Sequence, residues 1–343
     1  MDKRIIFAVA GSGKTTYLVN QIQEGERSLI LTYTVSNIRN LRENIINRFK
    51  AFPSNIRIMT YSSFLYSFCI QPFLMQEYKL KGLSYKQNSP RYAGKNDDKR
   101  YLTNNGRLYH NRAAKFIEMK CLYGDVKKRL EKYYRFFYID EIQDFAGHDF
   151  GLLRKISESN INILYVGDFF QHTFDTSRDG NVGETLYDDY GEYKNKFRNM
   201  GFVVDETTLI KSHRCCPQIC DYISNNLKIN IGSCKSEWSE IKYISNEVEI
   251  KSIMEDDNII KLFRQEHYSY KCRSKNWGDC KGENKYNDVC VILNKTTLDY
   301  YKKNNLSDLA KGTLNKLYVA ISRAHGNVYF ISEKEIQGYR KAK

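Results

Sequence analysis

Short apolar runs rich in β-branched residues alternate with segments of helical periodicity along the first half of the chain. Small or polar residues bound each run, which is typical of strands buried in a parallel sheet. In the segment 37–49, Ile38, Leu41, Ile45 and Ile46 recur at helical spacing and predict one apolar face. The other predicted elements are a helix from Lys14 to Gln23 and the strands 5–9, 28–34, 56–60, 136–139 and 161–166.

The alternation begins again beyond about residue 199. Pro217 suits the first turn of a helix, because proline has no N–H group to satisfy there. The elements predicted here are helices over 217–227 and 306–321 and strands over 241–245, 288–293 and 328–331. The pattern therefore predicts an α/β fold, in which helices flank parallel sheets.

The stretch 71–132 differs from both halves, because it lacks strand-like runs and places tyrosines among lysines and arginines. Only Arg112 to Leu130 is predicted to be helical. Basic and aromatic side chains together suit a groove for single-stranded nucleic acid; a solvated, partly disordered excursion is the alternative. We expect a first domain at 1–70 and 133–198, an insertion at 71–132 and a second domain at 199–343.

A glycine-rich loop joins the first predicted strand to the first helix. Strand, small-residue loop, Lys-Thr pair and helix form the arrangement that cradles phosphates, because glycines let backbone N–H groups approach the anion. The helix N-terminus adds a favourable dipole. Lys14 is expected to reach the β- and γ-phosphate oxygens, and the Thr15 hydroxyl to bind Mg²⁺. The expected binding residues are Ala10, Gly11, Ser12, Gly13, Lys14, Thr15 and Thr16.

Two adjacent carboxylates follow the predicted strand 136–139. Downstream of a phosphate loop they predict the second half of an NTPase site. Asp140 would hold Mg²⁺, and Glu141 would orient and deprotonate the attacking water. Gln171 follows the strand 161–166 and is suited to hydrogen-bond the γ-phosphate or that water.

Other polar and aromatic residues should share this edge of the sheet, because ligands lie beyond the carboxyl ends of parallel strands. They are Tyr33, Thr34, Thr60, Tyr61 and Ser62. Capping of the core rim is the alternative for both tyrosines. In the second half, Arg214 and Arg323 lie at element edges, where an arginine can reach a transferring phosphate from a neighbouring domain. A surface salt bridge is the alternative for either arginine.

The net charge of +14 and the 14% aromatic content fit a nucleic-acid partner, although a lysine- and asparagine-rich proteome would produce a similar composition. The nine cysteines show no spacing typical of zinc sites. No apolar run reaches membrane-spanning length, and the N-terminus enters a core strand at once. We therefore expect a soluble, cytoplasmic protein with reduced thiols and no membrane partner; the sequence does not predict its oligomeric state.

The ordered segments resemble those of a superfamily 1 DNA helicase of the UvrD/Rep type. The resemblance runs from Phe7 to Ser332. The DExQD form of the acidic segment is fairly specific to this branch. The matching segments are AVAGSGKTT (8–16), LTYT (31–34), TYSSF (60–64), IDEIQD (139–144), VGDFFQHTF (166–174), LIKSHR (209–214) and LYVAISRA (317–324).

The resemblance implies two RecA-like P-loop NTPase domains that hydrolyse ATP between them, with Mg²⁺, and move 3′ to 5′ on single-stranded DNA or at its junctions with duplex. It assigns Arg214 and Arg323 to the γ-phosphate and Tyr33 to the strand. His213 replaces the tyrosine that commonly stacks on adenine, and Glu283 would lie near the ribose.

Two departures from the family pattern change the expectation. The glutamine motif that precedes the phosphate loop is missing, so adenine selectivity is not predicted. The stretch between 214 and 280 is too short for the large 2B accessory domain, which leaves 71–132 as a small 1B-like module.

These departures keep a second function open, namely a DNA-stimulated ATPase that regulates a partner such as a nuclease and unwinds little itself. A small-molecule kinase explains neither DEIQD nor the two arginines.

Overall fold

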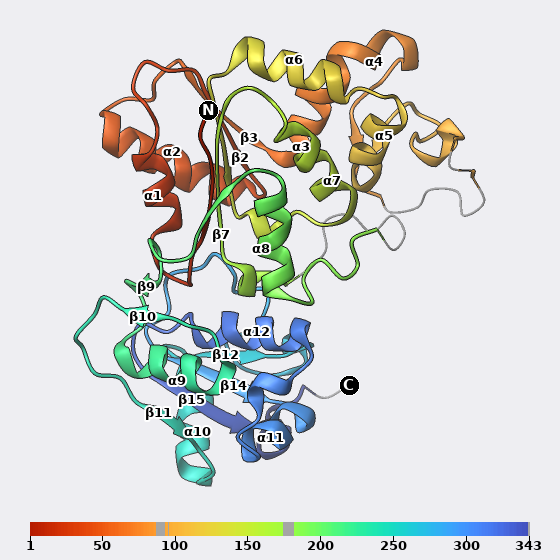
Figure 1. Ribbon diagram of the computed structural model, residues 1–343. Coiled ribbons are helices and arrows are strands. Elements are labelled where there is room, and N and C mark those ends of the chain that lie inside the picture. Colours follow the sequence, from red (N-terminus) through yellow and green to blue (C-terminus); the bar gives the residue numbers. More distant parts are fainter. Residues whose placement is uncertain (87–92, 95, 174–181, 342–343) are drawn as a thin grey trace. The chain divides into compact units, whose positions relative to one another are not determined.

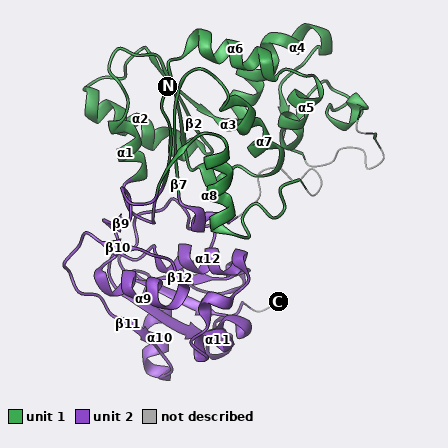
Figure 2. Ribbon diagram, in the orientation of Figure 1, with its two compact units in different colours: residues 1–6, 14–167, 174–205 green, residues 7–13, 168–173, 206–343 purple. Residues whose placement is uncertain are grey.

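The computed structural model describes residues 1–86, 93–94, 96–173 and 182–341. The chain forms two compact units, green and purple in Figure 2. Unit 1 comprises 1–6, 14–167 and 174–205, and unit 2 comprises 7–13, 168–173 and 206–343. Two short segments, 7–13 and 168–173, thus pack with unit 2 although each directly follows a strand segment of unit 1 in the chain.

Within the described residues, unit 1 is built on a six-stranded sheet in the order β3-β2-β6-β7-β1-β8. Figure 1 labels β2, β3 and β7 of this sheet. The strand pairs β3–β2, β2–β6, β6–β7 and β1–β8 are parallel. Their apolar runs are buried on both faces, and Leu29, Ile30 and Leu31 of β2 are fully buried. The strands are β1 (Lys3–Phe7), β2 (Ser28–Thr32), β3 (Ile56–Thr60), β6 (Phe136–Asp140), β7 (Asn162–Gly167) and β8 (Val203–Asp205).

Helices α1 and α2 pack against each other, α1 over β6 and β7 and α2 over β3. Helix α2 starts where the Thr34 hydroxyl accepts a hydrogen bond from the Asn37 N–H, which satisfies one of the free N–H groups of the first turn. Helix α1 ends at Asn20, before the predicted Gln23. The helices outside the insertion are α1 (Lys14–Asn20), α2 (Val35–Phe49), α3 (Tyr61–Ser63), α7 (Gly147–Ile156) and α8 (Tyr190–Asn199), with a π-helical segment at Phe64–Ile70.

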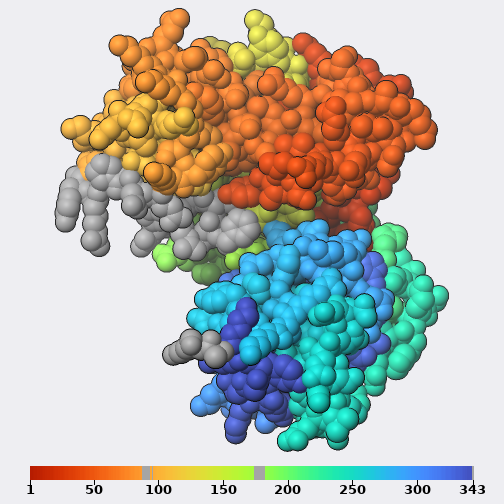
Figure 3. All heavy atoms as spheres, turned by 180° about the vertical axis from the view of Figure 1, so that it is seen from behind, coloured from red at the N-terminus to blue at the C-terminus, as the bar shows by residue number. Residues whose placement is uncertain are grey.

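The described part of the insertion contains more secondary structure than the one helix predicted; it is coloured orange to yellow in Figure 3. The single helix predicted over 112–130 is two helices, because Cys121 between them adopts a left-handed backbone with φ +56°. Both pack against α7. The elements are α4 (Gln71–Tyr78), α5 (Ala113–Met119), α6 (Tyr123–Tyr133) and the short parallel pair β4 (Leu83–Ser84) and β5 (Leu108–Tyr109).

Unit 2 contains a five-stranded parallel sheet among its described residues, in the order β11-β15-β14-β12-β13. The sequence did not predict β12, because a lysine interrupts its apolar run. Lys261 is nevertheless fully buried, and its ammonium donates to the Asp256 carbonyl at 2.6 Å. The strands are β11 (Ile241–Tyr243), β12 (Ile260–Phe263), β13 (Ser274–Asn276), β14 (Val289–Leu293) and β15 (Val328–Ser332); β9 (Lys211–Ser212) pairs separately with β10 (Gly232–Ser233).

Side chains of β14 alternate between two cores, as expected of a strand covered on both faces. Val289, Val291 and Leu293 join the core beneath α9 and α12. Cys290 and Ile292 join the core beneath α10. The helices of unit 2 are α9 (Pro217–Leu227), α10 (Glu247–Glu255), α11 (Lys295–Lys302) and α12 (Lys311–Ile321).

The predicted fold class, parallel sheets flanked by helices, is confirmed. One strand differs: β8 pairs with β1 in the first sheet, although the sequence places residues from 199 onward in the second domain. Its three residues are too few to show a strand pattern. None of the described helices is both long and apolar enough to cross a membrane.

Candidate functional site

The glycine-rich loop leaves β1 and packs on residues 209–214 of its own unit. The Val9 N–H donates to the Leu209 carbonyl at 3.0 Å, and the His213 N–H donates to the Gly11 carbonyl at 2.9 Å. Gly11 has φ +72°, and a Cβ there would lie 2.6 Å from Ser212 Oγ and 2.7 Å from Arg214 Cβ. Only glycine fits this position, for conformational and steric reasons alike.

Some N–H groups of the glycine-rich loop donate hydrogen bonds within the described part of the chain, and others do not. The N–H and hydroxyl of Ser12 both donate to the Val9 carbonyl, at 3.3 and 2.8 Å, which closes the turn. Among the described residues, the N–H groups of Gly11 and Gly13 donate no hydrogen bond. These are the groups that an anion bound at the loop would use. Thr16, the last residue of the predicted set, is exposed.

Lys14 and Thr15 begin α1 in unit 1, where Thr15 meets the end of β6. The Thr15 hydroxyl donates to Asp140 Oδ2 at 3.0 Å. Asp140 is buried, and its Oδ1 has no hydrogen-bond partner among the residues that the structure describes. Lys14, also buried, is close enough to lower the pKa of Asp140. An unsatisfied buried carboxylate oxygen beside a hydroxyl offers the hard oxygen ligands that Mg²⁺ prefers, so these residues fit the predicted metal.

The surroundings of Asp140 favour binding of a proton or a cation to its carboxylate. Burial is the main cause that raises its pKa, to about 7, and the neighbouring charge of Glu141 raises it further; Lys14 and the Thr15 hydroxyl act in the opposite direction. A metal bound at Oδ1 would supply a positive charge that compensates the buried, ionised carboxylate.

We expect Asp140 to destabilise the metal-free protein as the pH rises. Because its folded-state pKa is above the unfolded value of 3.8, the folded form binds more protons between about pH 4 and 7, and stability falls across that window. Asp140→Asn should therefore be more stable than wild type at pH 8, on the order of 1–3 kcal/mol, with a smaller difference at pH 5. Urea unfolding at both pH values without Mg²⁺ measures this. Equal differences at the two pH values would contradict it.

Glu141 follows Asp140 in a tight turn with φ +61°, a conformation that non-glycine residues rarely adopt. Its carboxylate accepts a hydrogen bond from the Gln143 amide. The turn lies directly on Gly167 at the end of β7, where a Cβ would come within 2.6 Å of Ile142 Cγ2 and 3.0 Å of the Ile142 N. Gly167 thus sets how closely the acidic turn approaches the sheet.

Gly167→Ala is expected to lower the free energy of unfolding by about 1–3 kcal/mol, because the added methyl group must displace the turn that carries Glu141. Gly151→Ala is the matched control. A Cβ at Gly151 in α7 meets nothing within 4 Å, so this variant should be neutral or more stable. Urea unfolding compares the two, and equal stability of the variants would contradict the close approach.

In unit 2, Gln171 donates a hydrogen bond to a buried carboxylate, and both arginines donate hydrogen bonds to neutral oxygens. The Gln171 amide donates to Asp168 Oδ2 at 2.8 Å. Arg323 is 1% exposed and donates to the carbonyls of Val319 and Glu283, each at 3.1 Å. Arg214 donates to Asn284 Oδ1 at 2.6 Å and to the Ser322 carbonyl at 3.0 Å.

Neither arginine has a carboxylate partner among the residues that the structure describes. Burial and the charge of Arg323 lower the pKa of Arg214 to about 10, so the guanidinium stays charged at neutral pH. A buried and a half-buried guanidinium near each other, neither paired with a carboxylate among the described residues, favour binding of an anion.

His213 and Glu283 occupy different surroundings. His213 is exposed, and its ring lies beside Gly13, within 4.0 Å of a Cβ placed there. The carboxylate of Glu283 is engaged by Lys275 at 2.6 Å and by the Tyr286 hydroxyl. The ribose contact proposed for Glu283 would have to compete with both.

The predicted strand-contacting residues of unit 1 separate into two groups. Tyr33, Thr60 and Ser62 are half-buried and Thr34 is exposed, so each has surface to offer. Tyr61 is 3% exposed and its hydroxyl donates to Asp149 at 3.0 Å. The structure therefore places Tyr61 in the core, which corrects the predicted DNA contact: a buried carboxylate that the pattern could not locate holds the ring inward.

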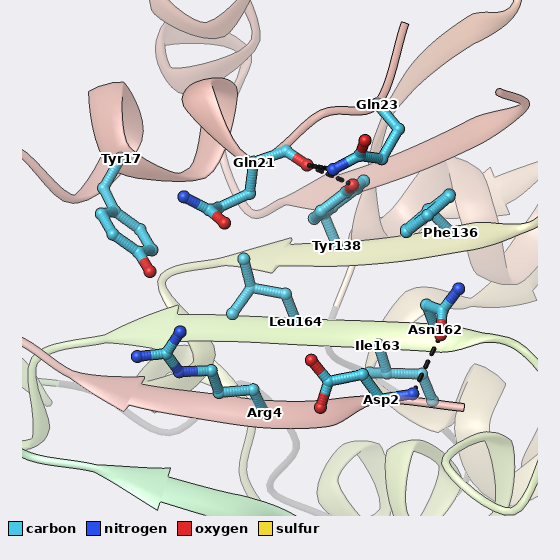
Figure 4. Close-up of a pocket in the computed structure, with 10 residues that line it drawn as sticks. All are labelled: Asp2, Arg4, Tyr17, Gln21, Gln23, Phe136, Tyr138, Asn162, Ile163 and Leu164. Atoms are coloured by element: carbon cyan, nitrogen blue, oxygen red, sulfur yellow. Dashed lines mark hydrogen bonds between the residues drawn. The ribbon is translucent and has the colours of Figure 1, made fainter. Parts of the chain in front are cut away.

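A separate pocket of about 220 Å³ lies in unit 1 between α1 and the strands β1, β6 and β7 (Figure 4). Tyr17, Gln21 and Arg4 line it. Arg4, however, pairs with Asp205, and the phosphate-loop residues do not line the pocket. In the described ranges no cluster of three or more His, Cys, Asp or Glu residues could hold a metal.

Four residues that the sequence did not single out contact the predicted site residues or the segments that carry them: Gly167 in unit 1, and Asp168, Asn284 and Tyr318 in unit 2. Asp168 and Gly167 stand inside the VGDFFQ segment and Tyr318 inside LYVAISRA, so the motifs marked the right segments without showing these contacts. No sequence pattern pointed to Asn284, because a single amide side chain in an irregular stretch belongs to no recognisable motif.

The described residues thus form two parallel sheets flanked by helices, with a glycine-rich loop directly after β1. No protein-family model matches the sequence, and no curated protein matches it. Among solved structures, the arterivirus nonstructural protein 10 helicase in complex with DNA is similar, with a TM-score of 0.52 and 12% identity over 99% of this chain and 63% of that chain. The same helicase in another crystal structure has a TM-score of 0.50 and 13% identity over 99% and 62%.

The chain therefore spans less than two thirds of the length of these helicases. At such low sequence identity, the likeness shows a shared fold.

Proposed function

We propose that this protein is an ATP-dependent translocase or helicase on single-stranded DNA, of superfamily 1 and the UvrD/Rep type. The observation that carries the proposal is the hydrogen bond from the half-buried Thr15 hydroxyl to Asp140, directly after a glycine-rich loop; Oδ1 of Asp140 lacks a partner among the described residues. The fold shared with a helicase solved in complex with DNA supports it. The 3′-to-5′ direction rests on the sequence resemblance alone.

The loop and unit 1 would together bind the ATP phosphates. Gly11 and Gly13 have N–H groups open to phosphate oxygens, and Lys14 would reach the β- and γ-phosphates. Mg²⁺, held by Thr15 and Asp140, would offset the charge that develops on the phosphates. Phosphate binding is independent of the base, and exposed His213 is the proposed stacking partner of adenine.

Hydrolysis needs a base and donors around the γ-phosphate. Glu141 would take the proton of the attacking water, and Gln171 would hydrogen-bond the γ-phosphate or that water. Arg214 and Arg323 would stabilise the charge of the transition state, which their lack of carboxylate partners among the described residues favours.

The strand would contact Tyr33, Thr34, Thr60 and Ser62 and the basic insertion 71–132. The net charge of +14 favours phosphate neutralisation, and the exposed Tyr85 of the insertion offers a ring for base stacking.

Strand displacement from partial duplexes with a 3′ or a 5′ single-stranded tail tests the proposal. We expect ATP-dependent displacement only with the 3′ tail. Equal displacement from both tails would contradict the direction. DNA-stimulated ATPase without displacement from either would favour instead the ATPase that regulates a partner such as a nuclease.

Asn284 provides a test of the arginine role. Asn284→Asp would place a carboxylate where Oδ1 now accepts from Arg214 at 2.6 Å, and the ion pair would compete with the phosphate. We expect at least about a tenfold loss of ATPase kcat. This loss is smaller than the loss of rate expected when an arginine finger is removed altogether. Asn225→Asp, at an exposed position of α9, is the charge-matched control. An unchanged rate in Asn284→Asp would argue against Arg214.

A further inference from the structure

A chain of buried hydrogen bonds within unit 2 joins the phosphate loop to Gln171. The Ala10 N–H donates to the Tyr318 hydroxyl at 2.8 Å, and this hydroxyl donates to Asp168 Oδ2 at 3.0 Å. The same oxygen accepts from the Gln171 amide at 2.8 Å. The chain brings together the loop, the segment 168–173 and helix α12, which are far apart in sequence.

The members of this chain are almost completely shielded from water. Ala10 and Tyr318 are 0% exposed, Asp168 is 1% and Gln171 is 3% exposed. Burial and the charge of Asp168 raise the pKa of Tyr318 well above its usual value, so the hydroxyl stays protonated and donates. A buried carboxylate must keep its donors, because losing one leaves charge without compensation. The arrangement is therefore sensitive to a single missing hydroxyl.

Helix α12 extends this connection toward the arginines. One turn before Tyr318, the Asn315 amide donates to the His172 carbonyl at 3.0 Å, and the Phe170 ring lies edge-on to the Tyr318 ring at 6.2 Å. At the other end of the helix, Arg323 Nε donates back to the Val319 carbonyl at 3.1 Å. One helix thus fixes both the Gln171 segment and Arg323.

We propose that Tyr318 and Asp168 are positioning residues, which hold the loop at Ala10 and the amide of Gln171 in a fixed relation to α12 and Arg323. The inference rests on the proposed ATPase function, in which Gln171 and Arg323 act at the γ-phosphate. A nucleotide bound at the loop would then meet these groups as one assembly, without separate adjustment of each.

A double-mutant cycle between Tyr318→Phe and Gln171→Ala tests the inference. The phenylalanine keeps the ring and removes only the hydroxyl that connects Ala10 to Asp168. We expect Tyr318→Phe to lower the DNA-stimulated ATPase kcat about tenfold, with KM for ATP changed by less than about threefold. The loss of kcat in the double variant should be clearly smaller than the product of the two single losses, because Tyr318 acts in part through Gln171.

Tyr222→Phe is the matched control, because the buried hydroxyl of Tyr222 in the same unit has no hydrogen-bond partner in the described part of the chain. This variant should keep the wild-type kcat. Asp168→Asn serves as a second variant in case Tyr318→Phe does not fold; it should also lower kcat without adding to Gln171→Ala.

Three outcomes would contradict the account. Multiplied losses in the double variant, or an unchanged kcat in a folded Tyr318→Phe, would overturn the positioning role while leaving the ATPase intact. A wild-type protein without ATP hydrolysis would overturn the proposed function, and this inference with it.

Discussion

Glu141→Gln is expected to lower the ATPase kcat by about 10²–10⁴-fold, because an amide cannot accept the proton of the attacking water. The substitution preserves the size of the side chain in the tight turn and leaves the Asp140 carboxylate in place. Binding of ATP and of single-stranded DNA should therefore persist. Steady-state phosphate release and fluorescence anisotropy of a labelled oligonucleotide measure the two properties on the same preparation.

The control is Glu43→Gln, which makes the same chemical change at an exposed position of α2 and should leave kcat unaltered. A normal kcat in Glu141→Gln would mean that another group activates the water, and the acidic turn would lose its assigned role.

Lys14→Ala should abolish ATP hydrolysis, with kcat/KM reduced at least about a thousandfold. The buried ammonium is the expected partner of the β- and γ-phosphates, and a charge-assisted contact in a site shielded from water is strong. Single-stranded DNA binding should survive, since the strand uses other residues. The measurements are isothermal titration with ATP and Mg²⁺ and the phosphate-release assay.

Lys155→Ala is the matched control for charge, because Lys155 forms an exposed ion pair with Glu158 at 3.0 Å and such pairs contribute little. ATP turnover in Lys14→Ala at the control's rate would show that the glycine-rich loop is not the nucleotide site.

The sheets could be predicted from the sequence because their strands are short, continuous apolar runs. The strand predicted over 56–60 is β3 without change, and those predicted over 136–139 and 161–166 match β6 and β7 to within a residue at each end. Parallel strands buried on both faces leave this signal in the residues themselves. Where the run is broken by Lys261 or is as short as β8, the signal disappears.

The site could be predicted in part. Motif spacing brought Thr15 and Asp140 to the same predicted edge, and the structure joins them by a hydrogen bond. The contacts of Tyr318 could not be predicted, because its partners Ala10 and Asp168 are separated from it by 308 and 150 residues. The burial of Tyr61 against Asp149 depends on tertiary packing in the same way.

The central claim, a nucleotide site that drives movement on a nucleic-acid strand, is tested most directly by one measurement on the wild-type protein. ATP hydrolysis is compared with no polymer, with single-stranded DNA, with duplex DNA and with RNA, at equal nucleotide concentration and salt. We expect slow hydrolysis alone and strong stimulation by single-stranded DNA. Hydrolysis that no polymer stimulates would contradict the claim.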